Sequence, residues 1–183
     1  MNMVSSRQAM FLGFLFVMPI VIVVNLMLRR PVTRMLGSIV VTLYGCGVVA
    51  VTFFPIPFSA GAILHMKAYG QGVIINLVPF KGMLESLNSS LYEGLKNIGG
   101  NVLLLLPLGC LGAYKRFFRN TGNVILAGLI LSLGIELLQW LLTEQNLIYP
   151  RSGDVDDVML NTAGFTVGSL IYNKWAKGRP RRL

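Results

Sequence analysis

Long apolar runs dominate the pattern of this chain. Residues 9–28 carry no charge, and a helix of that length crosses the roughly 30 Å hydrocarbon core of a bilayer. Further apolar runs occupy residues 36–54, 97–114, 123–142 and 155–173, the last of which opens with two aspartates. We therefore predict an all-α, polytopic transmembrane helix bundle of about five spans.

The first run has a competing interpretation as a cleaved secretory signal. It is longer than the usual apolar core of a signal, and Arg29, Arg30 and Arg34 follow it in place of small-residue cleavage chemistry. We therefore interpret it as the first span.

The connection between the second and third spans, residues 55–96, is not simply polar. It opens with an aromatic, proline-broken exit from the membrane, and Pro79 keeps residues 76–80 from being an ordinary helix interior. Residues 81–100 then place leucines on one face and polar side chains on the other. This pattern predicts an amphipathic helix, lying either at the membrane interface or against the bundle outside the membrane.

Composition agrees with a membrane protein. Apolar residues make up 54% of the chain, charged residues only 13%, and the mean hydropathy is +0.67. The net charge of +9 forms no stripe with interleaved aromatic residues, so we predict no nucleic-acid partner. Cys46 and Cys110 both lie in apolar spans, where we expect small buried thiols and no disulfide.

The basic residues predict the orientation in a cell membrane. Five spans place three basic segments on one side, with three cations in residues 29–35, three in 115–120 and five in 174–183. Short cytoplasmic loops hold the excess of Lys and Arg, so this side is the predicted cytoplasm and the N-terminus is outside. The seven acids then fall at or near the outer side: Glu85, Glu93, Glu136, Glu144, Asp154, Asp156 and Asp157.

This topology brings polar residues of three spans and two outer connections to one level in the outer leaflet. Ionisable groups within spans cost roughly 2.5–3.5 kcal/mol on insertion scales and usually mark function. The sequence therefore predicts an outer polar site. Its members are Asn97, Asn101, Glu136, Gln139, Arg151, Asp154, Asp156, Asp157 and Asn161.

A purely structural interpretation stays open. Glu136, Arg151 and Asp157 would then be a paired network that locks the helices, and the amides would be interhelical hydrogen bonds worth about 1 kcal/mol each. The surplus of acids over bases argues against it. For Gly164 and Gly168, whose spacing is typical of close helix contacts, helix packing is the favoured interpretation.

Five short motifs in a fixed order resemble those of the VanZ-like membrane proteins, a family named after a protein associated with teicoplanin resistance. They are Asn76-Leu-Val-Pro-Phe80; Gly100-Asn101 with Pro107-Leu-Gly109; Ser132-x3-Glu136-x2-Gln139; Arg151 with Asp154-x-Asp156-Asp157; and Asn161-Thr162-x-Gly164-x3-Gly168. The resemblance covers about residues 72–172. It implies a two-span region at 1–71, a VanZ-like domain at 72–173 and a basic cytoplasmic tail at 174–183.

The resemblance implies a small protein of the bacterial envelope linked to glycopeptide tolerance, and it supplies no mechanism. In one hypothesis the site binds or modulates a lipid-linked envelope precursor or a lipoglycopeptide among the membrane lipids. In the other, the protein is an acid/base enzyme that acts on a lipid-linked substrate, with Glu136, Asp157 and Arg151 as catalytic residues. The remaining ligand-binding candidates are Asn76, Asn101, Gln139, Asp154, Asp156 and Asn161.

Other chemistries have weaker signals. A transporter would use a buried acid to relay protons, but the chain has no visible inverted repeat. His65 lacks the partners of a zinc site, and we predict a solvated loop residue there. No cofactor is predicted, although a divalent cation on Asp154, Asp156 and Asp157 is chemically allowed.

Overall fold

The computed structural model describes residues 3–69, 75–118 and 120–177. It is 79% helical, and seven helices lie in these residues, which confirms the all-α class. The chain forms two compact units, Met1–Val73 with Leu141–Arg151, and Ile74–Trp140 with Ser152–Leu183.

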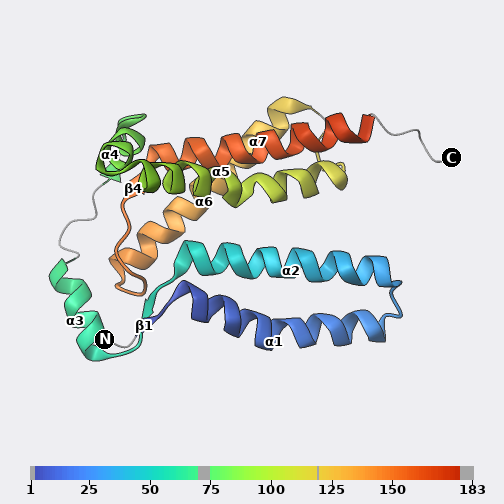
Figure 1. The fold of residues 1–183 in the computed structure, drawn as a ribbon, viewed down its shortest axis with the longest axis horizontal. Helices are drawn as coiled ribbons and strands as arrows, with labels where there is room; N and C mark the ends of the chain where they lie inside the picture. The colour runs from blue at the N-terminus through green and yellow to red at the C-terminus, as the bar shows by residue number, and fades with distance from the viewer. Residues whose placement is uncertain (1–2, 70–74, 119, 178–183) are drawn as a thin grey trace. The chain divides into compact units, whose positions relative to one another are not determined.

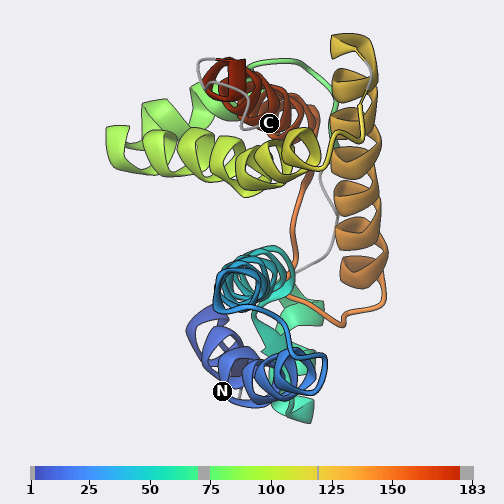
Figure 2. The same cartoon turned by 90° about the vertical axis from the view of Figure 1, so that its right-hand side faces the viewer.

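In the first unit, α1 (Ser6–Met27) and α2 (Val32–Phe53) lie side by side as an antiparallel hairpin (Figures 1 and 2). A capping box between Ser5 and Gln8 starts α1, because each satisfies a backbone N–H of the other. Deeper in the hairpin, the buried Asn25 amide donates to the Val21 carbonyl at 2.7 Å and accepts from the Ser38 hydroxyl at 3.3 Å. This bond joins the two helices.

The first unit also contains a helix that the hydrophobic pattern does not predict. Two short strands, β1 (Met3–Val4) and β2 (Ile56–Pro57), pair antiparallel, and α3 (Ala60–Tyr69) follows. The Ser59 hydroxyl accepts from the Ala62 N–H at 3.2 Å and so caps α3. His65 therefore lies exposed on a helix, and the prediction of a loop residue was wrong.

In the second unit, α5 (Leu91–Tyr114) and α7 (Val155–Lys177) lie along each other in parallel (Figures 1 and 2). A Cβ on Gly164 would lie 2.0 Å from the Val102 carbonyl oxygen, and one on Gly168 would lie 2.0 Å from that of Leu106. The backbones touch because these glycines have no side chain, as their spacing predicts. Cys110, a free thiol like Cys46, donates to the Gly168 carbonyl at 3.1 Å.

Helix α6 (Thr121–Glu144) contributes its residues up to Trp140 to the same unit. Its Val124 joins Leu105 and Phe165 in the buried core of the unit. A Cβ on Gly128 would lie 3.2 Å from Phe165, so this glycine leaves the Phe165 side chain room against α6.

The predicted amphipathic helix over residues 81–100 is two helices, so that prediction was wrong in its continuity. Helix α4 (Lys81–Ser89) ends at Ser90, whose extended backbone breaks the helix and whose hydroxyl accepts from the Glu93 N–H at 3.1 Å to start α5. A Cβ on Gly94 would lie 2.4 Å from the Leu87 side chain. Helix α4 therefore folds back closely onto the first turn of α5.

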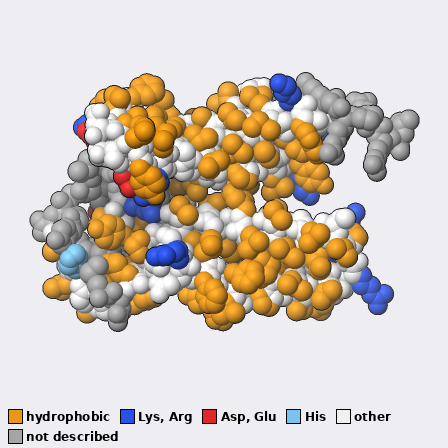
Figure 3. Space-filling model, viewed as in Figure 1, with side chains coloured by type: hydrophobic (Ala, Val, Ile, Leu, Met, Phe, Trp, Pro, Cys, Tyr) orange, Lys and Arg blue, Asp and Glu red, His pale blue; other side chains and the backbone are white. Residues whose placement is uncertain are grey.

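Four helices, α1, α2, α5 and α6, are long and apolar enough to cross a membrane, among the residues described. Helix α7 has the predicted position but is not among the four, and it opens with Asp156 and Asp157. Hydrophobic side chains cover much of the visible surface of these helices, as in Figure 3. The chain is therefore a membrane protein. Most of the predicted basic tail, residues 178–183, lies outside the described residues.

Candidate functional site

The first turn of α7 interlocks with the segment that leads into α4. Strands β3 (Ile75–Asn76) and β4 (Gly153–Asp154) pair in parallel, with Asn76 opposite Asp154. The Asn76 side-chain amide donates to Asp154 Oδ1 at 2.9 Å, and the same oxygen accepts from the Asp156 N–H at 2.9 Å. The same carboxylate oxygen of Asp154 therefore caps α7 and binds the Asn76 side chain.

Asp156 caps a helix other than its own. Its carboxylate is 1% exposed and accepts from the Phe80 N–H at 2.5 Å and from the Met83 N–H at 3.0 Å, at the start of α4. Phe80 has a positive φ of 68°, which costs a non-glycine residue energy. Because two charge-assisted hydrogen bonds stabilise that conformation, Asp156 fixes where α4 begins.

Gly82 allows the two carboxylates to approach α4. A Cβ at this position would lie 2.2 Å from Asp154 Oδ2 and 3.3 Å from Asp156 Oδ2. No side chain fits there without moving the acids, so Gly82 belongs to the same cluster.

Asp157 faces α5. Its Oδ1 accepts from the Asn101 side-chain amide, which also contacts Asn97 Oδ1 at 3.0 Å. Asn97 is exposed, whereas Asn101 and Asp157 are half-buried. The parallel packing of α5 and α7 thus brings Asn97, Asn101 and Asp157 together, and the purely structural interpretation explains part of this contact.

Asn161, one turn further along α7, is buried and incompletely bonded. It is 1% exposed, and its Oδ1 has no hydrogen-bond partner among the described residues. A buried acceptor left without a bond costs about 1–3 kcal/mol. The buried hydroxyl oxygen of the neighbouring Thr162 also has no hydrogen-bond partner among the described residues. The interior beneath Asp157 therefore has unused hydrogen-bonding capacity.

Glu136 and Gln139 lie half-buried on α6, in the second unit. They follow Ser132 by four and seven residues, so all three share one face of the helix, as predicted. Ser132 is fully buried, and Ile135, next to Glu136, packs on the core of the unit. Asp154, Asp156 and Asp157 accept hydrogen bonds from β3, α5, α7 and the start of α4, and the meeting of Glu136 with Asp157 stays a prediction.

Arg151 belongs to the first unit. Its Nη2 donates to the Val51 carbonyl at 2.8 Å and to the Phe54 carbonyl at 3.2 Å, at the C-terminal end of α2. A cation at this end of a helix satisfies carbonyls that lack helical partners. The predicted meeting of Arg151 with the acids of α7 therefore stays a prediction.

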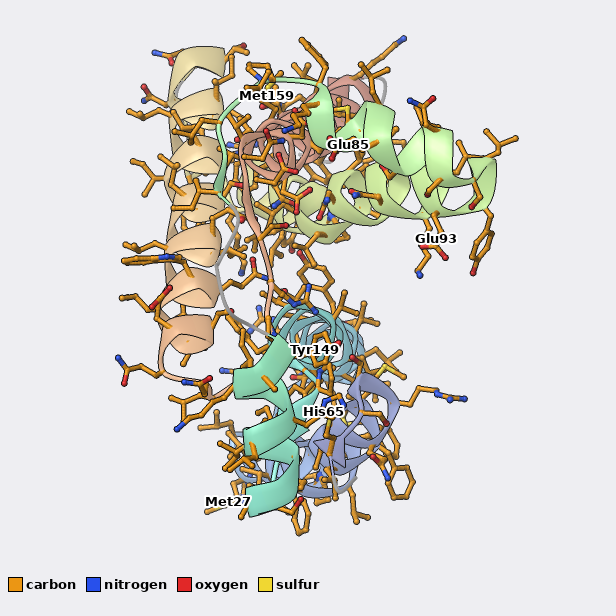
Figure 4. The ribbon with its side chains drawn as sticks, turned by 90° about the vertical axis from the view of Figure 1, so that its left-hand side faces the viewer. Met27, His65, Glu85, Glu93, Tyr149 and Met159 are labelled. Atoms are coloured by element: carbon orange, nitrogen blue, oxygen red, sulfur yellow. The ribbon has the colours of Figure 1, made fainter. Side chains whose placement is uncertain are left out.

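Sequence reasoning missed the helix break at Ser90 and the capping of α4 by Asp156. The first had a signal, because Ser90-Leu-Tyr-Glu93 has the spacing of a capping box. The second had none, since it depends on which helix meets the first turn of α7. Glu85 and Glu93 pair with neighbouring lysines at the surface, at 3.9 Å and 3.2 Å, and Figure 4 labels both on α4 and α5.

A metal site has no geometric support in the part of the chain that the structure describes. No group of three or more His, Cys, Asp or Glu side chains there is arranged to hold an ion. Asp154 and Asp156 direct carboxylate oxygens at the protein's own amide groups. The divalent cation stays an untested prediction, as does ligand binding by Asn76, Asp154 and Asp156.

The described geometry separates the candidates into two groups. Asn76, Asp154 and Asp156 build the connection between α4 and α7. Asn101, Asp157 and Asn161 line the contact of α5 with α7, where Asn101 donates to the Asp157 carboxylate and the buried Asn161 carbonyl oxygen has no hydrogen-bond partner among the described residues. We call these three residues the α5–α7 polar cluster.

Comparison with known protein families identifies a match over most of the chain. The family described as VanZ/LLP1 matches residues 40–176, about three quarters of the chain. The match begins within α2, further toward the N-terminus than the motifs at residues 72–172. No curated protein and no solved structure matches significantly.

Proposed function

Because this chain belongs to the VanZ/LLP1 family, we propose that it is an envelope membrane protein whose α5–α7 polar cluster binds a polar headgroup. The ligand is a lipid-linked envelope component or a lipoglycopeptide, and its binding contributes to tolerance of teicoplanin-type glycopeptides. Both ligands carry amide, hydroxyl and charged groups on a lipid tail, which suits a polar site at the end of membrane helices.

One observation carries this proposal: within the described part of the chain, the buried Oδ1 of Asn161 has no hydrogen-bond partner. A ligand hydroxyl or amide that donates to it would recover the energy of the missing hydrogen bond. Asp157, one turn nearer the end of α7, accepts from Asn101 of α5. The ligand would therefore meet polar side chains from both helices on its way to Asn161.

The distribution of charge in the second unit supports an outer location for this cluster. Since α5 and α7 are parallel, Asp156 and Asp157 lie at one end of the pair, and Lys115, Arg116 and Lys174 lie at the other. Basic ends favour the cytoplasm. We infer an outer cluster, an N-terminus outside and a C-terminus in the cytoplasm.

A second candidate function is acid/base catalysis on a lipid-linked substrate. It rests on Asp157, a half-buried carboxylate that accepts a hydrogen bond from the Asn101 amide. Glu136 would be the partner acid and Arg151 would hold a phosphate. Binding is the better supported function because no nucleophile with a paired base occurs among the described contacts of the cluster.

Replacing Asp157→Asn and Glu136→Gln tests both candidates in a strain that depends on the protein for teicoplanin tolerance. We expect Asp157→Asn to lower tolerance by fourfold or more, on the order of 1 kcal/mol of binding. Glu136→Gln lowers tolerance only if Glu136 is the partner acid of the enzyme. The membrane lipid profile is measured in parallel. A binder leaves that profile unchanged, whereas an enzyme loses a lipid product.

Glu85→Gln is the matched control, since Glu85 is an exposed acid of α4 in the same unit. It keeps full tolerance and equal amounts of membrane protein. If Asp157→Asn is as tolerant as this control, the proposed function is wrong. If tolerance falls together with one lipid species, the enzyme replaces the binder.

A further inference from the structure

A groove between α1 and α2 in the first unit has an almost wholly apolar lining. It is open to the surface and has a volume of about 620 Å³. A Cβ on Gly13 would lie 3.1 Å from Cys46 Sγ, so the helices touch there, whereas a Cβ on Gly45 would meet nothing within 4 Å. The groove is therefore widened by a missing side chain. Its lining includes Leu12, Gly13, Phe16, Gly45, Cys46 and Val49.

A second hollow of about 590 Å³ opens at the N-terminal end of α1. Ser5, Arg7 and Gln8 give it polar walls, and Arg7 brings a positive charge to its lining. Leu12 lines both hollows, so they are neighbours along α1. The hollow at the N-terminal end carries a cation, and the groove has apolar walls.

A second guanidinium lies beside the same groove. Phe54 is part of the groove lining, and its carbonyl accepts from Arg151 at 3.2 Å and from the Ser6 hydroxyl at 3.4 Å. Both bonds are within the first unit. Two guanidinium groups, those of Arg7 and Arg151, therefore lie near the end of the groove where α1 begins and α2 finishes.

We propose that the two hollows are one binding site for an anionic phospholipid. Its phosphate lies beside Arg7, because a guanidinium forms paired, charge-assisted hydrogen bonds with phosphate oxygens. One acyl chain lies in the groove, where it covers apolar walls. Arg7 is exposed at the end of a membrane-spanning helix, which is the depth of lipid headgroups.

Charge distinguishes this occupant from a transmembrane helix. A helix of a second copy would cover the apolar groove but would place no anion beside Arg7. A phospholipid matches both hollows. The site lies in the first unit and does not depend on the α5–α7 polar cluster, so its test is separate from that of the proposed function.

Native mass spectrometry of the full chain in detergent tests the site by measuring the affinity of the first lipid that binds. Palmitoyl-oleoyl phosphatidylglycerol and the matching phosphatidylcholine are compared, since they share acyl chains. We expect wild type to bind phosphatidylglycerol about tenfold more tightly, and Arg7→Gln to remove that preference. Lys67→Gln, an exposed cation on α3, is the charge control and keeps the preference.

The acyl end is tested by filling the groove. Gly45→Leu weakens binding of both lipids about tenfold by occupying the space of the chain. Gly47→Leu is the matched control, because a Cβ there also meets nothing within 4 Å and Gly47 does not line the groove. If Gly45→Leu does not fold, Val49→Phe fills the same groove.

Three results would overturn the proposal. Arg7→Gln could keep the wild-type preference for phosphatidylglycerol. Gly45→Leu could bind both lipids as Gly47→Leu does. A wild-type dimer that Gly45→Leu abolishes, with lipid binding unchanged, would assign the groove to a second copy of the chain.

Discussion

Two helix pairs of this protein meet in different ways. In α5 and α7 the backbones touch, since a Cβ on Gly164 or Gly168 would lie 2.0 Å from a carbonyl oxygen of α5. In α1 and α2 the closest glycine, Gly13, meets only the Cys46 side chain, and an apolar groove remains between the helices.

The difference shows what each pair is built to do. The contact of α5 with α7 leaves no room for adjustment, and it holds the polar cluster that the proposed function uses. The α1–α2 hairpin is joined by Asn25 and Ser38 and keeps a space that suits a lipid chain. The rigid contact therefore lies under the polar cluster, and the looser one faces the apolar groove.

The largest effect on stability is expected for Gly164→Ala. The new methyl group collides with backbone, which cannot rotate away, so we expect a loss of about 3 kcal/mol in unfolding free energy. Gly134→Ala on α6 meets nothing within 4 Å and should be neutral or stabilising. Equilibrium unfolding in detergent measures both. Equal stability of the two variants would contradict the close contact.

The next effect is expected at Asp156. Asp156→Ala leaves the Phe80 and Met83 N–H groups without acceptors, so we expect a loss of about 2 kcal/mol. Hydrogen exchange at these two amides should rise much more than exchange in the middle of α5. Protection unchanged from wild type would show that α4 holds its start without the acid.

The smallest effect is expected at Gly13. Gly13→Ala places its methyl group against a side chain, and Cys46 gives way by a few tenths of an ångström. We expect a change of less than about 1 kcal/mol in the same unfolding measurement. A loss as large as that of Gly164→Ala would mean that the two helix pairs are equally rigid.

Much of the fold follows from the sequence because the length of an apolar run and the length of a membrane helix are both set by the thickness of the bilayer. All five predicted runs are helices, and the Gly164 and Gly168 spacing correctly indicates close packing. Helix α3 was missed because its apolar and polar residues do not separate onto opposite faces of a helix. The break at Ser90 was missed because leucines continue at helical spacing across it.

The site was predicted less completely, for a different physical reason. Acids near a span end look alike in a sequence, whereas their roles depend on which N–H groups a neighbouring element offers. Asp156 is committed to α4, Asp154 to Asn76 and its own helix, and Asp157 to Asn101. Only the fold shows which N–H group each acid binds.

The most direct measurement is the teicoplanin tolerance of Asn161→Leu, read together with its unfolding free energy. Leucine has a similar size and removes the unbonded oxygen, so a purely structural Asn161 predicts equal or higher stability and unchanged tolerance. Our account predicts that stability is kept within about 1 kcal/mol while tolerance falls to that of a strain without the protein. Full tolerance in a stable Asn161→Leu variant would contradict it.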